Sequence, residues 1–210
     1  MKLFELGESL EKTLEQKEIR TPTEVQKKVI PQILQKKDII FQSDTGTGKT
    51  LAFLLPLIKL YSNEANKCVI VVSPTQELSS QIKTEAQSLG QKSVLFNGGS
   101  PIKRQIEQLK EKPFFICGSC SRILELIILK KIKINHIAAI VFDEADRLFS
   151  KELKEDTSKL IEKAGENNEI QFIACSATIK DDIQKNFNKA AKREIDFTIE
   201  ILPHEDILNQ

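Results

Sequence analysis

Ser43-Asp44-Thr45-Gly46-Thr47-Gly48-Lys49-Thr50 lies between two apolar runs of different character. The run before it, Asp38 to Phe41, has the length of a short strand, and the run after it, Leu51 to Leu55, indicates the opening of a buried helix. A strand, a glycine-containing loop and a helix therefore follow one another. Residues 43–50 are named the glycine loop below.

The residue types of the glycine loop predict a phosphate site. Gly46 and Gly48 allow the backbone to turn so that its N–H groups converge, and the following helix adds the positive end of its dipole. Lys49 can reach phosphate oxygens, and the Thr50 hydroxyl can bind Mg²⁺. An ordinary turn is the alternative, but a lysine-threonine pair after the second glycine serves no purpose in turn formation. The usual pattern begins with glycine where this chain has Ser43, whose small side chain should preserve the loop.

Length and composition fit one globular domain. The chain has 210 residues, of which 40% are hydrophobic and 29% charged, so it can bury a sizeable core. Its formal net charge of +1 shows no basic excess, and a nucleic acid partner would have to be held by a local patch. Two short charged stretches, Lys110–Lys112 and Lys130–Lys133, are interpreted as solvated surface.

The four cysteines favour buried free thiols over a metal site. Cys117 and Cys120 form a Cys-x-x-Cys pair, but no second pair or histidine cluster completes a zinc site. Cys68 and Cys175 lie in apolar, strand-like runs. Residues 1–8 lack the apolar core of a signal peptide, and no run approaches the length of a membrane span. The sequence therefore predicts a cytoplasmic protein without a membrane partner.

Two helices are expected before the glycine loop. Apolar spacing predicts an amphipathic helix from Leu3 to Leu14, ending near Lys17. A proline turn and the capping residue Thr23 begin a second helix. The helical pattern by itself places Gln26 of that helix at the surface.

Strand and helix patterns then alternate. The unbroken apolar run Cys68–Val72 is typical of a strand covered on both faces, as in a parallel sheet. The further predicted strands are Ser93–Phe96, Pro113–Cys117, Ile137–Phe142, Ile170–Cys175 and Ile195–Ile201, and the helices are Glu77–Leu89, Ile102–Leu109, Arg122–Leu129, Lys151–Lys163 and Asp181–Ala190. This alternation predicts an α/β fold with a doubly wound, mostly parallel sheet, helices on both faces and ligands at the carboxyl ends of the strands.

One strand ends in a pair of carboxylates. Asp143 and Glu144 follow the apolar run 137–142, where a magnesium nucleotide site needs them: Asp143 to hold the metal, Glu144 to orient and deprotonate an attacking water. An acidic helix N-terminus, favoured by the helix dipole, is the alternative. The glycine loop upstream favours the metal site.

The string Asp143-Glu144-Ala145-Asp146 resembles the name-giving motif of the DEAD-box RNA helicases. Other segments fall in that family's order: the glycine loop resembles its motif I, and Arg20–Gln26 its adenine-reading Q motif, with Phe4 as the upstream aromatic. Further matches are Pro74, Thr75, Glu77 and Leu78 for motif Ia, Gly98 and Gly99 for the double glycine, Arg122 for motif Ib, and Ser176, Ala177 and Thr178 for motif III. The resemblance covers essentially the whole chain and implies a RecA-like fold.

The resemblance implies ATP and Mg²⁺ as cofactors and assigns roles. Gln26 would bond the adenine edge, which favours ATP over GTP, and Ser176 and Thr178 would couple nucleotide state to RNA binding. The implied nucleotide residues are Ile19, Gln26, Ser43, Asp44, Thr45, Gly46, Thr47, Gly48, Lys49 and Thr50, with Thr50 and Asp143 at the metal and Lys49, Asp143, Glu144, Ser176 and Thr178 in catalysis. The implied RNA residues are Pro74, Thr75, Gln76, Glu77, Gly98, Gly99, Ser119 and Arg122. They would hold the backbone of single-stranded or duplex RNA, largely independently of sequence.

The chain departs from the family pattern on its adenine and RNA sides. Ile19 stands where the family has an aromatic residue that stacks on adenine, and Glu18 stands in place of glycine. Gln76 replaces the arginine of motif Ia, and Cys120 falls within a motif Ib that keeps only Arg122 and a hydroxyl. The hydrolysis residues are unchanged.

The family's active unit has two RecA-like domains, and nothing in this chain resembles the second. We therefore expect residues 1–202 to form the helicase ATP-binding domain, with the Q motif in 4–26, and residues 203–210 to begin the interdomain linker. Because the second domain supplies an arginine finger, the chain alone should bind nucleotide and hydrolyse it poorly.

Two other functions fit part of the sequence. An RNA-binding or scaffold module without catalysis is compatible with Gln76 and Cys120, but the intact Lys49, Asp143 and Glu144 argue against it. A P-loop kinase or small-molecule ATPase would give the motif Ia, double-glycine and motif III segments no purpose.

Overall fold

The computed structural model describes residues 4–44, 46–178, 181–194 and 197–199. Within them the chain forms a seven-stranded sheet of order β3-β4-β2-β5-β6-β1-β7, and every pairing is parallel. The strands are β1 (Ile39–Gln42), β2 (Cys68–Val72), β3 (Ser93–Phe96), β4 (Phe115–Gly118), β5 (Ile137–Asp143), β6 (Gln171–Ser176) and β7 (Phe197–Ile199). The predicted α/β parallel sheet is confirmed.

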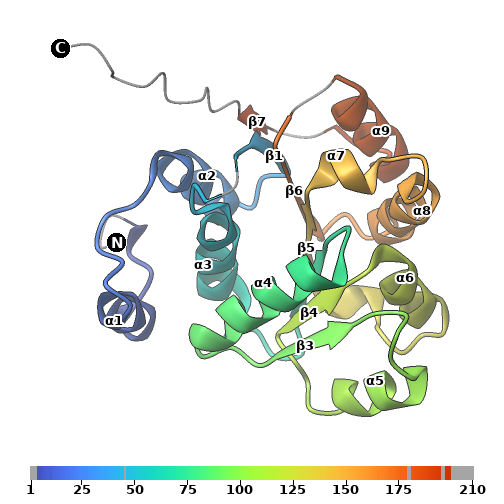
Figure 1. The fold of residues 1–210 in the computed structure, drawn as a ribbon, viewed down its shortest axis with the longest axis horizontal. Helices are drawn as coiled ribbons and strands as arrows, with labels where there is room; N and C mark the ends of the chain where they lie inside the picture. The colour runs from blue at the N-terminus through green and yellow to red at the C-terminus, as the bar shows by residue number, and fades with distance from the viewer. Residues whose placement is uncertain (1–3, 45, 179–180, 195–196, 200–210) are drawn as a thin grey trace.

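Two helices precede β1, and the later helices connect successive strands, as parallel pairing requires. They are α1 (Glu8–Gln16), α2 (Glu24–Leu34), α3 (Lys49–Tyr61), α4 (Gln76–Ser88), α5 (Ile102–Leu109), α6 (Cys120–Ile128), α7 (Ala145–Leu148), α8 (Lys154–Gly165) and α9 (Asp181–Ala191), with a 3₁₀ turn, η2, at Ile134–His136. Figure 1 shows α1 to α3 on one side of the sheet and α6 to α9 on the other. The sheet is therefore covered on both faces, as predicted.

Alternate residues of each strand enter two separate cores. Ile39 and Phe41 of β1 pack with α1 to α4, whereas Ile40, between them, packs in the second core with α6 to α9. This is the two-residue period of a strand with an apolar layer on either face. The strands β2, β4 and β5 are buried along their whole length, so both of their faces can be apolar.

The N-terminal helix is shorter than predicted. α1 begins at Glu8 rather than Leu3, because Gly7 precedes it with a φ of 98°, outside the helical region. Phe4 and Leu6 are nevertheless buried in the first core, which they reach from irregular backbone. The apolar spacing therefore predicted the burial of Phe4 and Leu6 correctly, but it did not predict that both lie outside the helix. Leu3 lies outside the described residues.

Other boundaries also differ from the prediction. The four-residue helix α7 and the turn η2 were not predicted, and α8 begins at Lys154 rather than Lys151. Of the predicted last strand, 197–199 are described as β7; Ile195, Asp196 and residues 200–210, which include the predicted linker, lie outside the described residues.

The strand order places the motif segments along one edge of the sheet. β1, β6 and β5 are neighbours, with Gln42 in register with Ser176 and Asp143 in register with Cys175. The glycine loop and the carboxylates therefore leave the sheet side by side. β2, β4 and β3 form the other half, and the segments after them carry the predicted RNA residues.

Candidate active site

The glycine loop takes the backbone shape that its glycines permit. Gly46 and Gly48 have φ values of 80° and 87°, which residues with a Cβ rarely adopt. Ser43 is buried, its Oγ lies 2.5 Å from Oγ1 of Thr47, and Thr47 donates to the carbonyl of Asp44. The small Ser43 side chain thus fits at the first position of the loop. Thr45 lies outside the described residues.

Gln26 joins the second helix to the glycine loop. Its Oε1 accepts from the Thr23 N–H and the Thr23 hydroxyl accepts from the Gln26 N–H, which makes a capping box for α2. Its Nε2 donates to the carbonyl of Gly48 over 3.1 Å. A Cβ added to Gly48, whose φ is 87°, would be strained there and would lie 2.6 Å from this nitrogen, so another residue would displace the Gln26 amide. The helical pattern placed Gln26 at the surface, and that was wrong: it is 2% exposed.

Lys49 and Asp143 face each other from α3 and the end of β5. The Lys49 Nζ lies 3.7 Å from Oδ1 of Asp143, and both side chains are largely buried. The Cys175 thiol donates to the same oxygen over 3.0 Å. Burial, with the Asp143 charge beside it, raises the pKa of Cys175 well above its ordinary value, so the thiol remains a proton donor at neutral pH. Both contacts fall on Oδ1. The other carboxylate oxygen makes no ion pair or side-chain hydrogen bond within the described residues.

Glu144 sits in a sharp turn between β5 and α7. Its φ of 52° and ψ of 53° lie in the left-handed region, which costs a non-glycine residue about 1 to 2 kcal/mol. Its Oε2 is 2.7 Å from Nη1 of Arg147, an exposed side chain that can release it at little cost. Strain of this kind is common where a side chain is held for function.

Ser176 connects the end of β6 to the acidic motif. Its Oγ donates to the carbonyl of Thr178 and accepts from the N–H of Asp146, while its carbonyl accepts from the N–H of Ser43. The predicted residues Ser176 and Thr178 are thus bonded to each other. Oδ1 of Asp146 is buried without a hydrogen-bond partner in the described part of the chain. Asp146 had no predicted role; its place in the acidic motif was the only signal.

A pocket of about 510 Å³ opens over the glycine loop, a size within the range of small-molecule sites. Predicted residues in its wall are Ile19, Gly46, Gly48, Lys49, Thr50, Asp143 and Glu144. Lining residues without a predicted part in nucleotide binding are Lys17, Leu51, Leu78, Gln81, Ile82 and Glu85. Most of these belong to α4, whose position across the sheet cannot be inferred from its own pattern. Gln26 and Phe4 are absent from the lining; Phe4 is buried in the core.

At the carboxyl ends of β2, β4 and β3, three of the predicted RNA residues make contacts within the fold. The hydroxyls of Thr75 and Ser119 cap α4 and α6, accepting from the N–H groups of Leu78 and Arg122. Nη1 of Arg122 donates to Ser100 and Gln105, and its Nε pairs with Glu125 over 3.0 Å.

The remaining predicted RNA residues lie beside these caps. Gln76, Glu77, Gly98 and Gly99 are exposed and Pro74 is half-buried, all in segments that follow the neighbouring strands β2 and β3. The structure thus brings the predicted RNA residues to one edge, beside the glycine-loop half.

An all-parallel sheet with the glycine loop after β1 and the acidic motif after β5 is the arrangement of a RecA-like domain, and the class rests on the solved structures that this chain resembles. A hypothetical ATP-dependent RNA helicase from Sulfolobus tokodaii superposes with a TM-score of 0.80 at 27% identity, over 92% of this chain and 56% of that one. A DEAD box protein from Methanococcus jannaschii gives 0.82 at 28% identity, over 92% and 53%.

Sequence comparison narrows the class to a family. The model of the DEAD/DEAH box helicase family matches residues 23–186, and the chain belongs to that family. It is 40% identical over 161 residues to the DEAD-box ATP-dependent RNA helicase CshC of Bacillus cereus, covering 74% of this chain and 41% of the relative. It is 39% identical over 194 residues to the ATP-dependent rRNA helicase RRP3 of Encephalitozoon cuniculi, covering 90% and 48%. The chain spans less than half the length of these two relatives.

Within the described residues, no helix combines the length and apolarity that a bilayer crossing requires.

Proposed function

We propose that this chain is the ATP-binding domain of an ATP-dependent RNA helicase, in which it acts with a second RecA-like domain to separate short RNA duplexes. The observation that carries the proposal is the buried but loosely paired Lys49 and Asp143, facing each other beside the glycine loop. Buried charges without saturating partners are costly, and a site that binds a charged ligand is where they are retained.

The donor set fits Mg²⁺ and the phosphates of ATP. Asp143 and Thr50 offer a carboxylate and a hydroxyl, the oxygen ligands that Mg²⁺ prefers, and both line the same pocket. Lys49 and the N–H groups at the start of α3 would bind the phosphates. When bound, Mg²⁺ would neutralise charge that develops on the transferred phosphoryl group. Glu144, once released by Arg147, would orient the attacking water and accept its proton.

The nucleobase would lie near Ile19, which lines the pocket without offering an aromatic face. Gln26 is bonded to Thr23 and to Gly48, so it can read adenine only if its amide exchanges one of these partners. We expect apolar contact with the base and a preference for adenine that depends on Gln26.

The RNA backbone would lie along the other half of the edge. Helices α4 and α6 begin there, and the first-turn N–H groups that the Thr75 and Ser119 caps leave unbonded suit phosphate oxygens. Contacts to the backbone carry no base code, so binding would be largely independent of sequence.

The four buried cysteines, none in a disulfide, support a cytoplasmic location.

The test is titration of a fluorescent adenine nucleotide with Mg²⁺, in competition with ATP, ADP and GTP. We expect ATP and ADP to compete better than GTP, and Lys49→Ala to lower affinity by at least about tenfold through loss of the phosphate contact. Lys28→Ala, an exposed lysine on α2, is the matched control. Circular dichroism verifies that both variants fold. A folded wild-type chain that binds no nucleotide would favour the scaffold function instead.

A further inference from the structure

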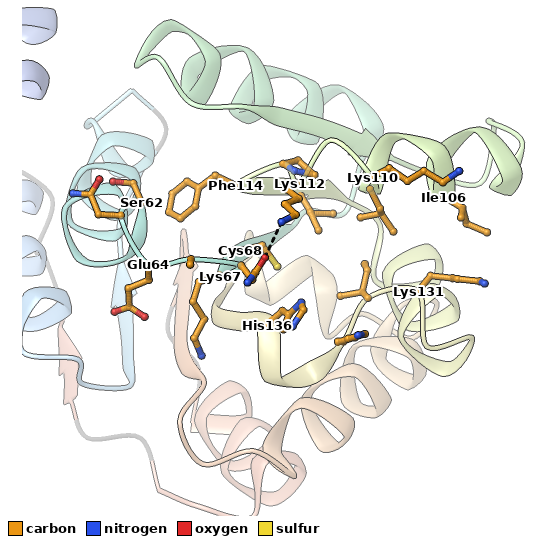
Figure 2. A pocket seen from close by; sticks show the side chains of 18 residues that line it. Ser62, Glu64, Lys67, Cys68, Ile106, Lys110, Lys112, Phe114, Lys131 and His136 are labelled. Atoms are coloured by element: carbon orange, nitrogen blue, oxygen red, sulfur yellow. Dashed lines mark hydrogen bonds between the residues drawn. The ribbon is translucent and has the colours of Figure 1, made fainter.

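A second pocket lies at the opposite edge of the sheet. Three loops surround it, residues 62–67 before β2, 109–114 before β4 and 131–136 before β5, and it encloses about 750 Å³. Figure 2 shows their side chains converging from the three loops. The glycine loop follows the carboxyl end of β1, whereas these loops precede their strands. A ligand here would not compete directly with one at the glycine loop.

Lysines rim this pocket, which we name the lysine pocket. Its lining includes Lys67, Lys110, Lys112, Lys131 and Lys133, together with His136, against one acidic side chain, Glu64. The stretches Lys110–Lys112 and Lys130–Lys133, far apart in sequence, thus meet at one place. In a chain of net charge +1, this is a concentration of positive charge on one side.

Two of these lysines keep their charge uncompensated by the contacts they make. The Lys112 ammonium donates to Oδ1 of Asn66 over 3.1 Å, drawn as the dashed line in Figure 2, and Lys67 donates to the carbonyl of Asn135 over 3.3 Å. Both acceptors are neutral. Lys110, by contrast, is paired with Glu107 at 2.7 Å. The pocket therefore attracts negative charge.

The floor of the lysine pocket is apolar. Ile106 and Leu109 of α5 are partly exposed there, above the buried Ile116 and Ile132. Such a floor beneath a charged rim suits a ligand that carries an apolar side chain between negative groups. The ring of Phe114 is buried and packed edge-on against Phe115, so the lining offers no exposed phenylalanine, tyrosine or tryptophan ring on which an RNA base could stack, and His136 carries its one partly exposed aromatic ring.

The walls also offer hydrogen-bond acceptors. Glu64 and the amide oxygens of Asn63 and Asn66 lie in the lining and can accept from N–H groups. A peptide backbone supplies an N–H donor at nearly every residue, whereas the RNA backbone supplies only its 2′-hydroxyls among acceptor phosphates. From the charge, the floor and these acceptors, we propose that the lysine pocket docks an acidic segment of a partner protein, with an apolar side chain seated over Ile106 and Leu109.

The test uses a pooled set of short fluorescein-labelled peptides in which aspartate or glutamate flanks one leucine, isoleucine or phenylalanine. Binding to the chain is followed by anisotropy at low salt. We expect Lys112→Glu/Lys133→Glu to weaken binding by about tenfold or more, because two rim charges become repulsive. Lys28→Glu/Lys151→Glu, two exposed lysines elsewhere, should bind as the wild type does. Nucleotide titration verifies that the site at the glycine loop is unchanged.

Two further arms identify the chemistry. Replacing the apolar residue of the bound peptide by serine should weaken binding by about tenfold, since the floor contact is lost. A lysine-for-glutamate version of that peptide should bind the Lys112→Glu/Lys133→Glu variant better than the wild type. The proposal is overturned if no peptide binds, if the lysine variant binds as well as its control, or if single-stranded RNA displaces the peptide and loses affinity in the same variant, which would make this a nucleic acid surface.

Discussion

Two buried ion pairs lie at opposite ends of the sheet, one before β1 and one at the end of β5, the two strands that flank β6, and they are built differently. Asp38, directly before β1, lies 2.7 Å from Nε of Arg193; Asp143, at the end of β5, lies 3.7 Å from Lys49. The two carboxylates are almost equally buried, with side-chain exposures of 8% and 4%. Burial alone therefore does not distinguish them.

The partners do. Arg193 also donates to the carbonyls of Asn168 and Ile170 and covers the ring of Phe172, while Asp38 accepts from the Phe172 N–H over 2.7 Å. The pair at Asp143 has one ion contact and one thiol bond, both on the same oxygen. The Asp38–Arg193 pair is held by several contacts within the fold, whereas the Lys49–Asp143 pair leaves its charges available to a ligand.

The largest expected effect on stability follows from breaking the Asp38–Arg193 pair. Arg193→Ala should lower the free energy of unfolding by about 3 to 5 kcal/mol, because it removes the opposite charge that faces the buried Asp38 carboxylate. Urea denaturation measures this. A double-mutant cycle with Asp38→Asn should give a large coupling energy, whereas the same cycle on Lys49 and Asp143 should give less than about 1 kcal/mol. Equal coupling in the two cycles would remove the distinction drawn above.

Alkaline pH should act on the Lys49–Asp143 pair through Cys175, whose thiol donates to Asp143. Burial raises the pKa of Cys68, Cys117 and Cys120 to about 12, and that of Cys175 well above its ordinary value. Above about pH 9 the unfolded chain loses thiol protons that the folded chain keeps, so stability falls as pH rises, by about 1.4 kcal/mol per pH unit for each thiol.

The variant Cys175→Ala isolates one of these thiols. Its free energy of unfolding should fall less steeply, by about 1.4 kcal/mol per pH unit, in the window from about pH 9 upward. Denaturation in the presence of a reductant, at several pH values, gives both slopes. Parallel slopes for the variant and the wild type would mean that Cys175 ionises as readily in the folded protein as in the unfolded chain.

The smallest effect on stability should come from Asp143→Asn. Asparagine keeps an oxygen for the Cys175 thiol, and Lys49 lines a pocket in which water can hydrate it, so the free energy of unfolding should change by less than about 1 kcal/mol. The same change should abolish the part of nucleotide affinity that depends on Mg²⁺. Glu152→Gln, an exposed carboxylate outside the pocket, is the control. A large loss of stability with Mg²⁺ dependence retained would assign Asp143 to the fold.

Much of the fold follows from local sequence signals. The run Cys68–Val72 and the helix Ile102–Leu109 have the predicted bounds, because polar and turn residues interrupt the pattern sharply at their ends. Where the end depends on backbone geometry the prediction failed, as at Gly7. The order in which strands pair is set by contacts between distant segments, and alternation alone does not contain it.

The candidate site divides in the same way. The residues of the glycine loop and the acidic motif were predicted from their own spacing, and the structure brings them to one edge. Gln26 was placed at the surface because helical periodicity cannot anticipate a bond to Gly48, which lies far along the chain. The α4 wall of the pocket and the apolar floor beneath the solvated lysines arise only from packing between elements.

The position of β1 in the sheet has a consequence for synthesis. Its neighbours are β6 and β7, drawn from residues 171–199, and the N–H of Ser43 is bonded to the carbonyl of Ser176. The glycine loop leaves the ribosome early, but the strand that fixes it emerges more than a hundred residues later. Such long-range pairing is slow to form and exposes unpaired strand edges meanwhile. A nascent chain halted before β6 would contain the whole glycine loop and would still lack the strand that pairs with β1 and holds the loop in place.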